Sequence, residues 1–152
     1  MFDFSAPVKV DSTEAMQRLG RQLAAQLVAG DVVYLRGPLG AGKTTLAQAI
    51  VHALGFSGRV KSPSYGLLEA YPADDFEIAH LDLYRLSGPE QVLDLGLEAY
   101  ASNGSVMLIE WPDLGGDYLP KANWVIEIED MPPSDGDPMG HATRRWVTVS
   151  RV

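Results

Sequence analysis

The sequence contains no cysteine. This absence excludes disulfide bonds, cysteine-ligated zinc, iron–sulfur clusters and thiol nucleophiles, and it fits a reducing compartment. No stretch approaches the roughly 18 apolar residues that a membrane-spanning helix needs. Residues 1–12 lack both a basic start and a long apolar run, so we expect no secretory signal. The sequence therefore predicts a soluble, cytoplasmic protein that does not associate with membranes.

Positive charge is scarce and unevenly spread. The chain has 12 basic and 20 acidic residues, which gives a net charge of −8. Residues 1–61 hold seven Lys or Arg and four Asp or Glu, whereas residues 62–152 hold five and sixteen. A chain this acidic is repelled by a polyphosphate backbone. We therefore expect no direct binding of nucleic acid, although the basic N-terminal part can hold a small anion.

The chain has the length and composition of one globular domain. With 152 residues, of which 46% are hydrophobic, it suits a single domain over residues 1–152. Apolar side chains at helical spacing predict a helix that starts after Asp11 or Ser12 and stops by Gly30. The same spacing predicts a second helix over residues 43–54.

Extended runs of β-branched and apolar residues alternate with these helices. They predict strands over residues 32–35, 76–82, 106–109, 124–129 and 146–150. Residues 87–90 fit a capping box that opens a further short helix, and residues 131–139 have the composition of an exposed hairpin loop. The pattern favours an α/β sandwich whose sheet gains antiparallel strands towards the C-terminus.

A phosphate-binding loop stands out between the first predicted strand and the second predicted helix. Residues 37–44 satisfy the pattern G-x-x-x-x-G-K-[ST], and the backbone N–H groups of residues 40–42 are expected to face phosphate oxygens. Lys43 is expected to reach the β- and γ-phosphates, Thr44 to coordinate Mg²⁺, and Thr45 to contact the α-phosphate. The competing interpretation is a glycine-rich turn that matches the pattern by chance. Sequence context favours nucleotide binding.

A nucleoside triphosphatase also needs an acidic side chain near its metal ion. Glu110 directly follows the apolar run 106–109, and Asp82 ends the run 76–81 with His80 on the same face. Either carboxylate could instead be a solvated group at a strand end. Position in the sequence leaves open which of the two holds the metal and which orients water.

The segment between the second helix and the next strand, residues 61–65, allows two interpretations. Its hydroxyls at Ser62, Ser64 and Tyr65 could sense a γ-phosphate, as switch segments do, or it could be an ordinary polar connector. Trp111 could stack on a base or a partner or simply belong to the core. The guanine-reading N-K-x-D motif is absent, which favours adenine.

Four segments in order resemble one protein family. They are Gly37–Thr45, Val60–Tyr65, His80–Leu86 and Ile109–Pro112. The combination H-x-D-L-Y-R-L with I-E-W-P is similar to that of the small bacterial ATPase family TsaE, also called YjeE. Members take part in making threonylcarbamoyladenosine (t6A) in tRNA. The resemblance covers roughly residues 8–130.

The resemblance implies a P-loop NTPase-like three-layer sandwich with a mixed sheet, ATP and Mg²⁺ as ligands, and weak ATP hydrolysis. It also implies roles for particular residues. Glu110 would accompany Thr44 at the metal, Asp82 would join Lys43 as a catalytic group that assists hydrolysis, and Thr13 would touch the nucleotide.

The chain departs from the family pattern at four positions. Pro38 stands where Asp or Asn is common, Ser64 replaces the usual Thr, and Asp113 replaces a frequent Glu. A G-R-x-x-R pattern near the C-terminus is replaced by Gly140–Arg144, which puts a nucleotide contact at His141 or Arg144 in question.

The resemblance implies an accessory Mg²⁺-dependent ATPase that acts on a complex of TsaD and TsaB and meets tRNA only through that complex. A small-molecule kinase of the P-loop class is one alternative, but Arg85 is the only basic residue between positions 62 and 120, which disfavours a cationic lid. A nucleotide-gated binding module without significant turnover is the other.

Overall fold

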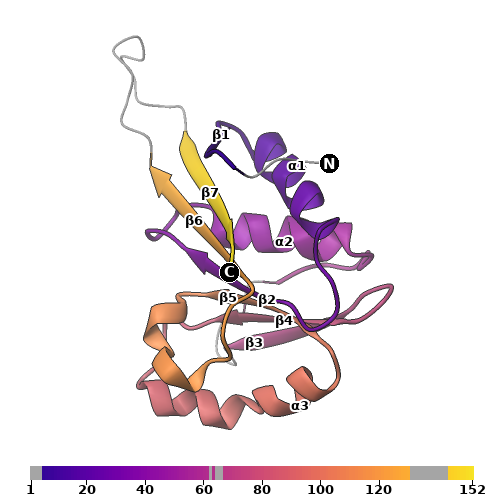
Figure 1. Cartoon of the computed structure of the whole chain (residues 1–152), viewed down its shortest axis with the longest axis vertical. Helices are drawn as coiled ribbons and strands as arrows, with labels where there is room; N and C mark the ends of the chain where they lie inside the picture. Colours follow the sequence, from indigo (N-terminus) through magenta and orange to yellow (C-terminus); the bar gives the residue numbers. More distant parts are fainter. Residues whose placement is uncertain (1–4, 62, 64–66, 131–143) are drawn as a thin grey trace.

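The computed structural model of the chain describes residues 5–61, 63, 67–130 and 144–152. These residues form one seven-stranded sheet with helices on both faces (Figure 1). In chain order the elements are β1 (Val8–Val10), α1 (Thr13–Ala24), β2 (Val32–Arg36), α2 (Lys43–Ala53), β3 (Leu68–Pro72), β4 (Glu77–Asp82), the 3₁₀ helix η1 (Pro89–Leu95), α3 (Leu97–Ser102), β5 (Val106–Glu110), the 3₁₀ helices η2 (Pro112–Leu114) and η3 (Gly116–Tyr118), β6 (Trp124–Asp130) and β7 (Arg145–Arg151).

The sheet is mixed, as predicted. Its strand order is β1-β7-β6-β2-β5-β4-β3. The centre is parallel, because β2 pairs in parallel with β5 and β6, and β5 pairs in parallel with β4. Both edges are antiparallel, with β7 paired to β6 and β1 on one side and β3 paired to β4 on the other. The predicted loop at residues 131–139 lies outside the described residues.

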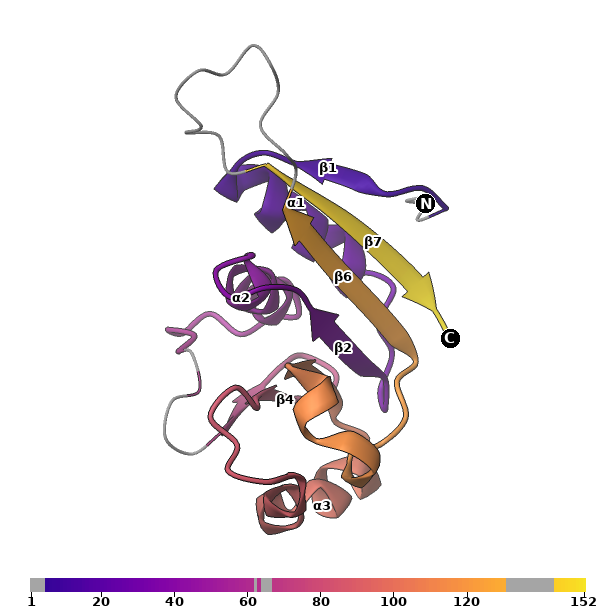
Figure 2. The same ribbon diagram turned by 90° about the vertical axis from the view of Figure 1, so that its left-hand side faces the viewer.

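Helices lie on both faces of the sheet and form three layers with it (Figures 1 and 2), and two apolar cores separate these layers. One core joins α1 and α2 to one face of the sheet, and the other joins η1 and α3 to the opposite face. Helices α1 and α2 approach closely at Gly20, where an added Cβ atom would lie 2.5 Å from the Cβ atom of Ala49. The small residue lets α1 lie directly against the helix that follows the phosphate loop.

The alternation of side chains along the central strands decides which residues face α2. On β5, Val106 and Leu108 belong to the core under α1 and α2, whereas Met107 and Ile109 belong to the other core. Successive side chains of a strand point to opposite faces. Glu110 therefore points towards α2, and the same count on β4 sends His80 and Asp82 to that side.

Several local predictions need correction. Ser12 caps α1 as predicted, accepting a hydrogen bond from the Ala15 N–H, but the helix ends at Ala24, well before Gly30. The predicted capping box at residues 87–90 is wrong. Gly88, which has no side chain, is the N-cap of the 3₁₀ helix η1. The Ser87 N–H and hydroxyl donate instead to the side-chain oxygen of Gln91.

Five elements have no counterpart in the sequence prediction: β1, β3, α3, η2 and η3. Among the described residues, no helix has the length and apolar character needed to cross a membrane.

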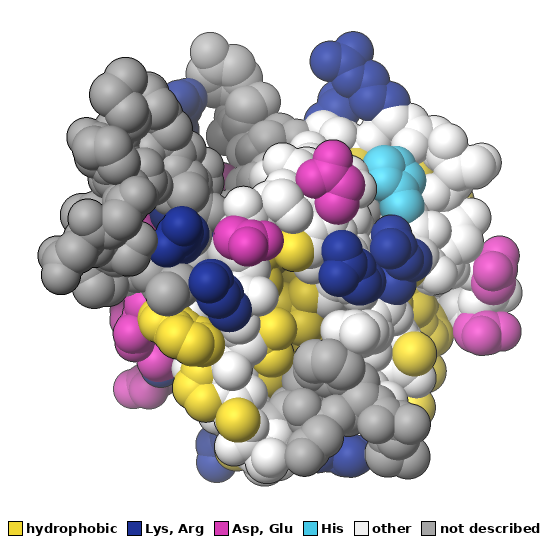
Figure 3. Space-filling view, turned by 90° about the horizontal axis from the view of Figure 1, so that it is seen from above, with side chains coloured by type: hydrophobic (Ala, Val, Ile, Leu, Met, Phe, Trp, Pro, Cys, Tyr) yellow, Lys and Arg dark blue, Asp and Glu magenta, His cyan; other side chains and the backbone are white. Residues whose placement is uncertain are grey.

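On the face seen from above, Lys and Arg side chains gather around a band of apolar ones (Figure 3). The negative net charge therefore does not extend evenly over the surface.

Candidate functional site

The glycine-rich loop follows β2 and leads directly into α2. Gly42 is the N-cap of α2 and adopts a left-handed backbone with φ of 104°, which a residue with a side chain rarely adopts. No side chain caps this helix, so the N–H groups of its first turn remain available to an anion. A Cβ atom on Gly37 would lie 2.7 Å from the Ile128 carbonyl oxygen of β6. Glycine at this position lets the loop lie close to the sheet.

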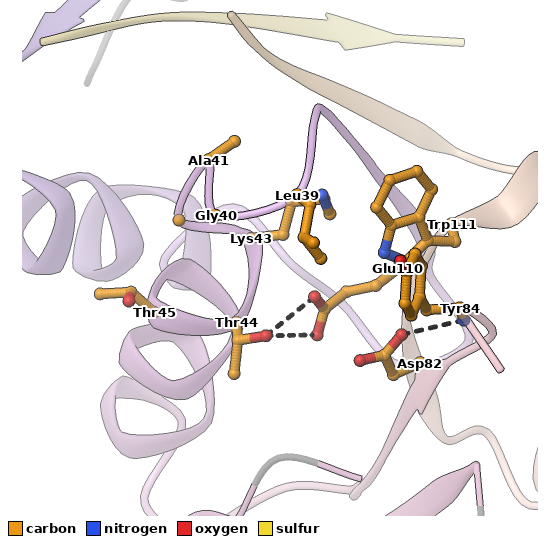
Figure 4. A pocket seen from close by; sticks show the side chains of 11 residues that line it. Leu39, Gly40, Ala41, Lys43, Thr44, Thr45, Asp82, Tyr84, Glu110 and Trp111 are labelled. Atoms are coloured by element: carbon orange, nitrogen blue, oxygen red, sulfur yellow. Dashed lines mark hydrogen bonds between the residues drawn. The ribbon is translucent and has the colours of Figure 1, made fainter. Parts of the chain in front are cut away.

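A pocket opens beside this loop (Figure 4). Loop and helix residues 39–45 line one side, and Asp82, Tyr84, Glu110 and Trp111 line the other. The loop and helix residues predicted to bind nucleotide and metal, 40–45, therefore share one cavity with the two predicted carboxylates. The apolar side chains of Leu39 and Tyr84 are exposed at this pocket.

Lys43 lies folded into its own loop. Its Nζ donates hydrogen bonds to the carbonyl oxygens of Gly37 at 2.6 Å and Pro38 at 2.8 Å. The ammonium also lies 4.1 Å from the centre of the Trp111 ring. Burial lowers the pKa of Lys43, although the nearby carboxylates of Glu110 and Asp82 act in the opposite direction. A phosphate that enters the pocket would replace these neutral carbonyls with charged oxygens.

The hydroxyl of Thr44 and the carboxylate of Glu110 meet across the pocket. The Thr44 Oγ1 donates to Glu110, at 2.9 Å from Oε1 and 3.2 Å from Oε2 (Figure 4). Glu110 is only 2% exposed. A hydroxyl beside a carboxylate suits Mg²⁺, which prefers oxygen ligands and usually keeps water and phosphate oxygens for its other positions. Among the described residues, no three His, Asp or Glu side chains form a metal cage.

Asp82 faces the same pocket from the end of β4. Its Oδ1 accepts a hydrogen bond from the Tyr84 N–H at 3.1 Å. Burial raises the pKa of Asp82, and the charge of Glu110 adds to this effect. The Tyr84 N–H, His80 and Lys43 act in the opposite direction. A carboxylate whose pKa is raised in this way is a candidate for handling a proton or orienting water.

Thr13 lies apart from this pocket. It lines a neighbouring hollow together with loop residues 40–42, Thr45 and Arg145. The structure thus brings Thr13 next to Thr45, and Thr45 borders both this hollow and the pocket of Asp82 and Glu110. A ligand that touches all of these residues must extend from one hollow to the other.

Arg145 holds the loop from the start of β7 and was not foreseen from the sequence. Its Nε donates to the Ala41 carbonyl and its Nη2 to the Gly40 carbonyl, both at 3.2 Å. Its Nε also lies 3.1 Å from the carboxylate of Asp130 on β6. Since the C=O and N–H of a trans peptide point in opposite directions, these bonds turn the following N–H groups away from the guanidinium. No local sequence signal marks this residue.

His80 is the second residue whose role was not predicted. Its side chain is fully buried, and its Nε2 lies 2.6 Å from Glu110 Oε2. The sequence placed His80 on the same face as Asp82 but gave no indication of this contact.

The structure describes two further candidate residues, Trp111 and His52, whereas the remaining candidates lie outside the described residues. Trp111 packs against the core beneath η1 and α3, and its ring also lies at a tilt on Tyr84, with ring centres 5.1 Å apart, at the edge of the pocket. His52 is exposed and bonds the Gly58 carbonyl. The predicted contacts at Ser62, Ser64, Tyr65 and His141 lie outside the described residues.

Comparisons with known proteins identify the family of the chain. Residues 10–135 match the family model described as "Threonylcarbamoyl adenosine biosynthesis protein TsaE". The chain belongs to the TsaE family. The family is named for the biosynthesis of threonylcarbamoyladenosine, the modified nucleoside of tRNA.

Relatives within the TsaE family cover most of the chain. The TsaE protein of Haemophilus influenzae is 40% identical over 120 residues, which span 76% of each chain. The TsaE protein of Streptomyces coelicolor is 37% identical over 142 residues, which span 88% of this chain and 95% of the relative. The crystal structure of YdiB from Bacillus subtilis superposes with a TM-score of 0.74 at 26% identity, covering 97% of this chain and 85% of that one. The predicted family and fold are therefore confirmed.

Proposed function

We propose that the protein is a Mg²⁺-dependent ATPase that supports the t6A modification of tRNA. The observation that carries this proposal is the contact between Thr44 and Glu110 beside a glycine loop that ends in Lys43. These groups come from α2 and β5, and together they offer a triphosphate backbone N–H donors, an ammonium and two oxygen ligands for a divalent ion. Membership of the TsaE family indicates that the pathway is the biosynthesis of threonylcarbamoyladenosine.

In this proposal each side chain has a distinct task. Lys43 leaves the Gly37 and Pro38 carbonyls and binds the terminal phosphates, while loop N–H groups and Thr45 hold the rest of the phosphate chain. Thr44 and Glu110 hold Mg²⁺, which neutralises charge on the phosphates. Asp82 orients the attacking water and accepts its proton, for which a raised pKa is suited. Thr13 contacts the nucleotide from the neighbouring hollow.

Turnover by the isolated protein is expected to be slow. The described residues that line the pocket include one lysine and no arginine. An arginine that stabilises the transferring phosphoryl group, in cis or from a partner, contributes about 10³–10⁵ to turnover in related phosphate-loop enzymes. A site with a lysine alone fits an ATPase whose activity depends on its partners.

The proposed partners are TsaD and TsaB, and the proposed setting is the cytoplasm. The net charge of −8 makes the isolated chain a poor ligand for polyphosphate, so tRNA would be bound by the complex and not by this subunit. ATP binding and hydrolysis would then change the affinity of the chain for TsaD–TsaB. We propose that residues 1–152 act as a single domain in this cycle.

A reconstituted modification reaction tests the proposal. TsaD, TsaB, tRNA and an activated threonylcarbamoyl donor are combined with or without this protein and ATP, and both t6A and released phosphate are measured. We expect repeated rounds of modification and phosphate release only when protein and ATP are both present. Phosphate release at buffer level in the complete mixture would favour a nucleotide-gated binding module instead. A phosphorylated metabolite would favour the kinase.

A further inference from the structure

His80 is a buried polar residue in the middle of the sheet. It lies on β4, where Ile78 and Leu81 are also fully buried, and its own side chain has no exposed surface. Strand β4 pairs in parallel with β5, so that Asp82 lies opposite Glu110. His80 and Glu110 therefore project from neighbouring strands to the same side of the sheet, beneath the start of α2.

The imidazole makes one short contact and leaves its other nitrogen without a partner. Its Nε2 lies 2.6 Å from Glu110 Oε2, whereas its Nδ1 is buried and has no hydrogen-bond partner among the described residues. A buried polar atom without a partner costs free energy that an aliphatic side chain would avoid. Packing alone therefore does not account for histidine at this position. The contact with Glu110 does.

The two oxygens of Glu110 have different surroundings. The Thr44 hydroxyl lies nearest Oε1, at 2.9 Å, and His80 Nε2 binds Oε2. An ionised carboxylate only accepts hydrogen bonds, so the imidazole Nε2–H is the donor. A glutamate side chain rotates about three bonds, and a rigid donor that hydrogen-bonds to one of its oxygens limits this rotation. The Oε1 side then remains directed at Thr44 and the phosphate loop.

We propose that His80 is a positioning residue that fixes the Glu110 carboxylate for binding of Mg²⁺ together with nucleotide. This inference rests on the proposed function of the Thr44–Glu110 pair. His80 acts through Glu110 and does not itself touch the ion, since its Nε2 is occupied by the carboxylate and its Nδ1 is buried without a hydrogen-bond partner among the described residues. Loss of such an outer partner typically weakens metal binding by about 10- to 100-fold.

Two substitutions at His80 separate positioning from packing. In His80→Gln the amide nitrogen can occupy nearly the place of Nε2 and still donate to Glu110. In His80→Asn the amide is one bond shorter and withdraws the donor, while the residue stays polar. The matched control is His52→Gln, which changes an exposed histidine on α2 that contacts the Gly58 carbonyl oxygen.

Calorimetric titration with ADP, run once in the presence of Mg²⁺ and once in the presence of EDTA, gives the decisive readout. We expect His80→Asn to weaken the Mg²⁺-dependent part of ADP binding by about tenfold or more, with little change in EDTA. His80→Gln should restore most of the loss, and His52→Gln should match the wild type. Urea unfolding in parallel reports stability, which a purely structural role would change without moving the affinity of folded protein for Mg²⁺.

The results distinguish this inference from the proposed function. Unchanged Mg²⁺-dependent binding in folded His80→Asn, or a loss in His80→Gln as large as in His80→Asn, would overturn the positioning role. Failure of the wild type to bind ADP at all would overturn the proposed function instead. Should His80→Asn not fold, His80→Leu replaces it, because the leucine side chain adds no buried polar atom of its own, and the same criteria apply.

Discussion

The Thr44 hydroxyl lies 2.9 Å from Glu110 Oε1, although the two residues are 66 positions apart in the chain. Thr44 belongs to the first turn of α2, and Glu110 is the last residue of β5. The parallel pairing of β2 with β5 produces this contact, because it brings the carboxyl end of β5 beside the loop that leaves β2. The ligands expected for Mg²⁺ thus come from β5 and from the helix that follows the neighbouring strand β2.

Glu110→Gln keeps the shape of this side chain but removes its charge. We expect the Mg²⁺ concentration that gives half-maximal ATP hydrolysis to rise by at least about tenfold, because even the loss of an outer partner has that effect on a metal site. ADP binding in EDTA should change much less. Phosphate release measured across a Mg²⁺ titration checks this.

Glu129→Gln at the exposed end of β6 is the control for this substitution and should behave as the wild type. A Mg²⁺ dependence that stays the same in Glu110→Gln would show that the carboxylate does not hold the ion.

Asp82→Asn should slow ATP hydrolysis and stabilise the fold at neutral pH. Burial raises the Asp82 pKa, so the folded chain binds this proton more tightly than the unfolded chain. The contribution of Asp82 to the free energy of unfolding therefore falls as pH rises through the raised pKa, and the ionised carboxylate is a net cost at pH 7. Asparagine removes this cost and can still accept from the Tyr84 N–H.

Urea unfolding at pH 7 and at about pH 4, near the usual aspartate pKa, checks the stability effect. The advantage of Asp82→Asn should shrink at the lower pH, where the native carboxyl gains its proton. The exposed variant Asp117→Asn should leave turnover unchanged. A stability difference that is equal at both pH values, or undiminished hydrolysis, would contradict the role assigned to Asp82.

Arg145→Lys should weaken nucleotide binding without abolishing it. The guanidinium holds the Gly40 and Ala41 carbonyls together, and a lysine ammonium cannot reproduce this planar fork. Without this fork the loop must become ordered when nucleotide binds, at a cost of about 0.5–1.5 kcal/mol, so we expect the affinity for ADP to fall by up to about tenfold.

Calorimetry with ADP measures this effect, and Arg151→Lys at the other end of β7 is the matched control. Equal affinities in the two variants would mean that Arg145 does not organise the loop.

The sequence predicted the parts of the structure whose signals are local. The loop between β2 and α2 follows from its glycines and from the elements on either side, and the apolar runs before Asp82 and Glu110 predict that both carboxylates lie at strand ends. The short strand β1 was missed because its three residues are stabilised by pairing with distant β7.

The contacts of His80 and Arg145 could not be predicted for a similar reason. The contact between His80 and Glu110 depends on the pairing of β4 with β5, and the grip of Arg145 on the loop depends on where β7 begins. Neither residue stands in a pattern of neighbouring residues that indicates such a role. Tertiary pairing determines both contacts.

Binding of ATP to the phosphate loop is the central claim, and Lys43→Ala tests it most directly. Calorimetric titration with ATP and Mg²⁺ compares the wild type, Lys43→Ala and the exposed control Lys121→Ala, with urea unfolding used to show that each is folded. We expect wild type and Lys121→Ala to bind one ATP with equal affinity and Lys43→Ala to show no measurable binding. Equal ATP affinity in all three proteins would contradict the assignment of the loop.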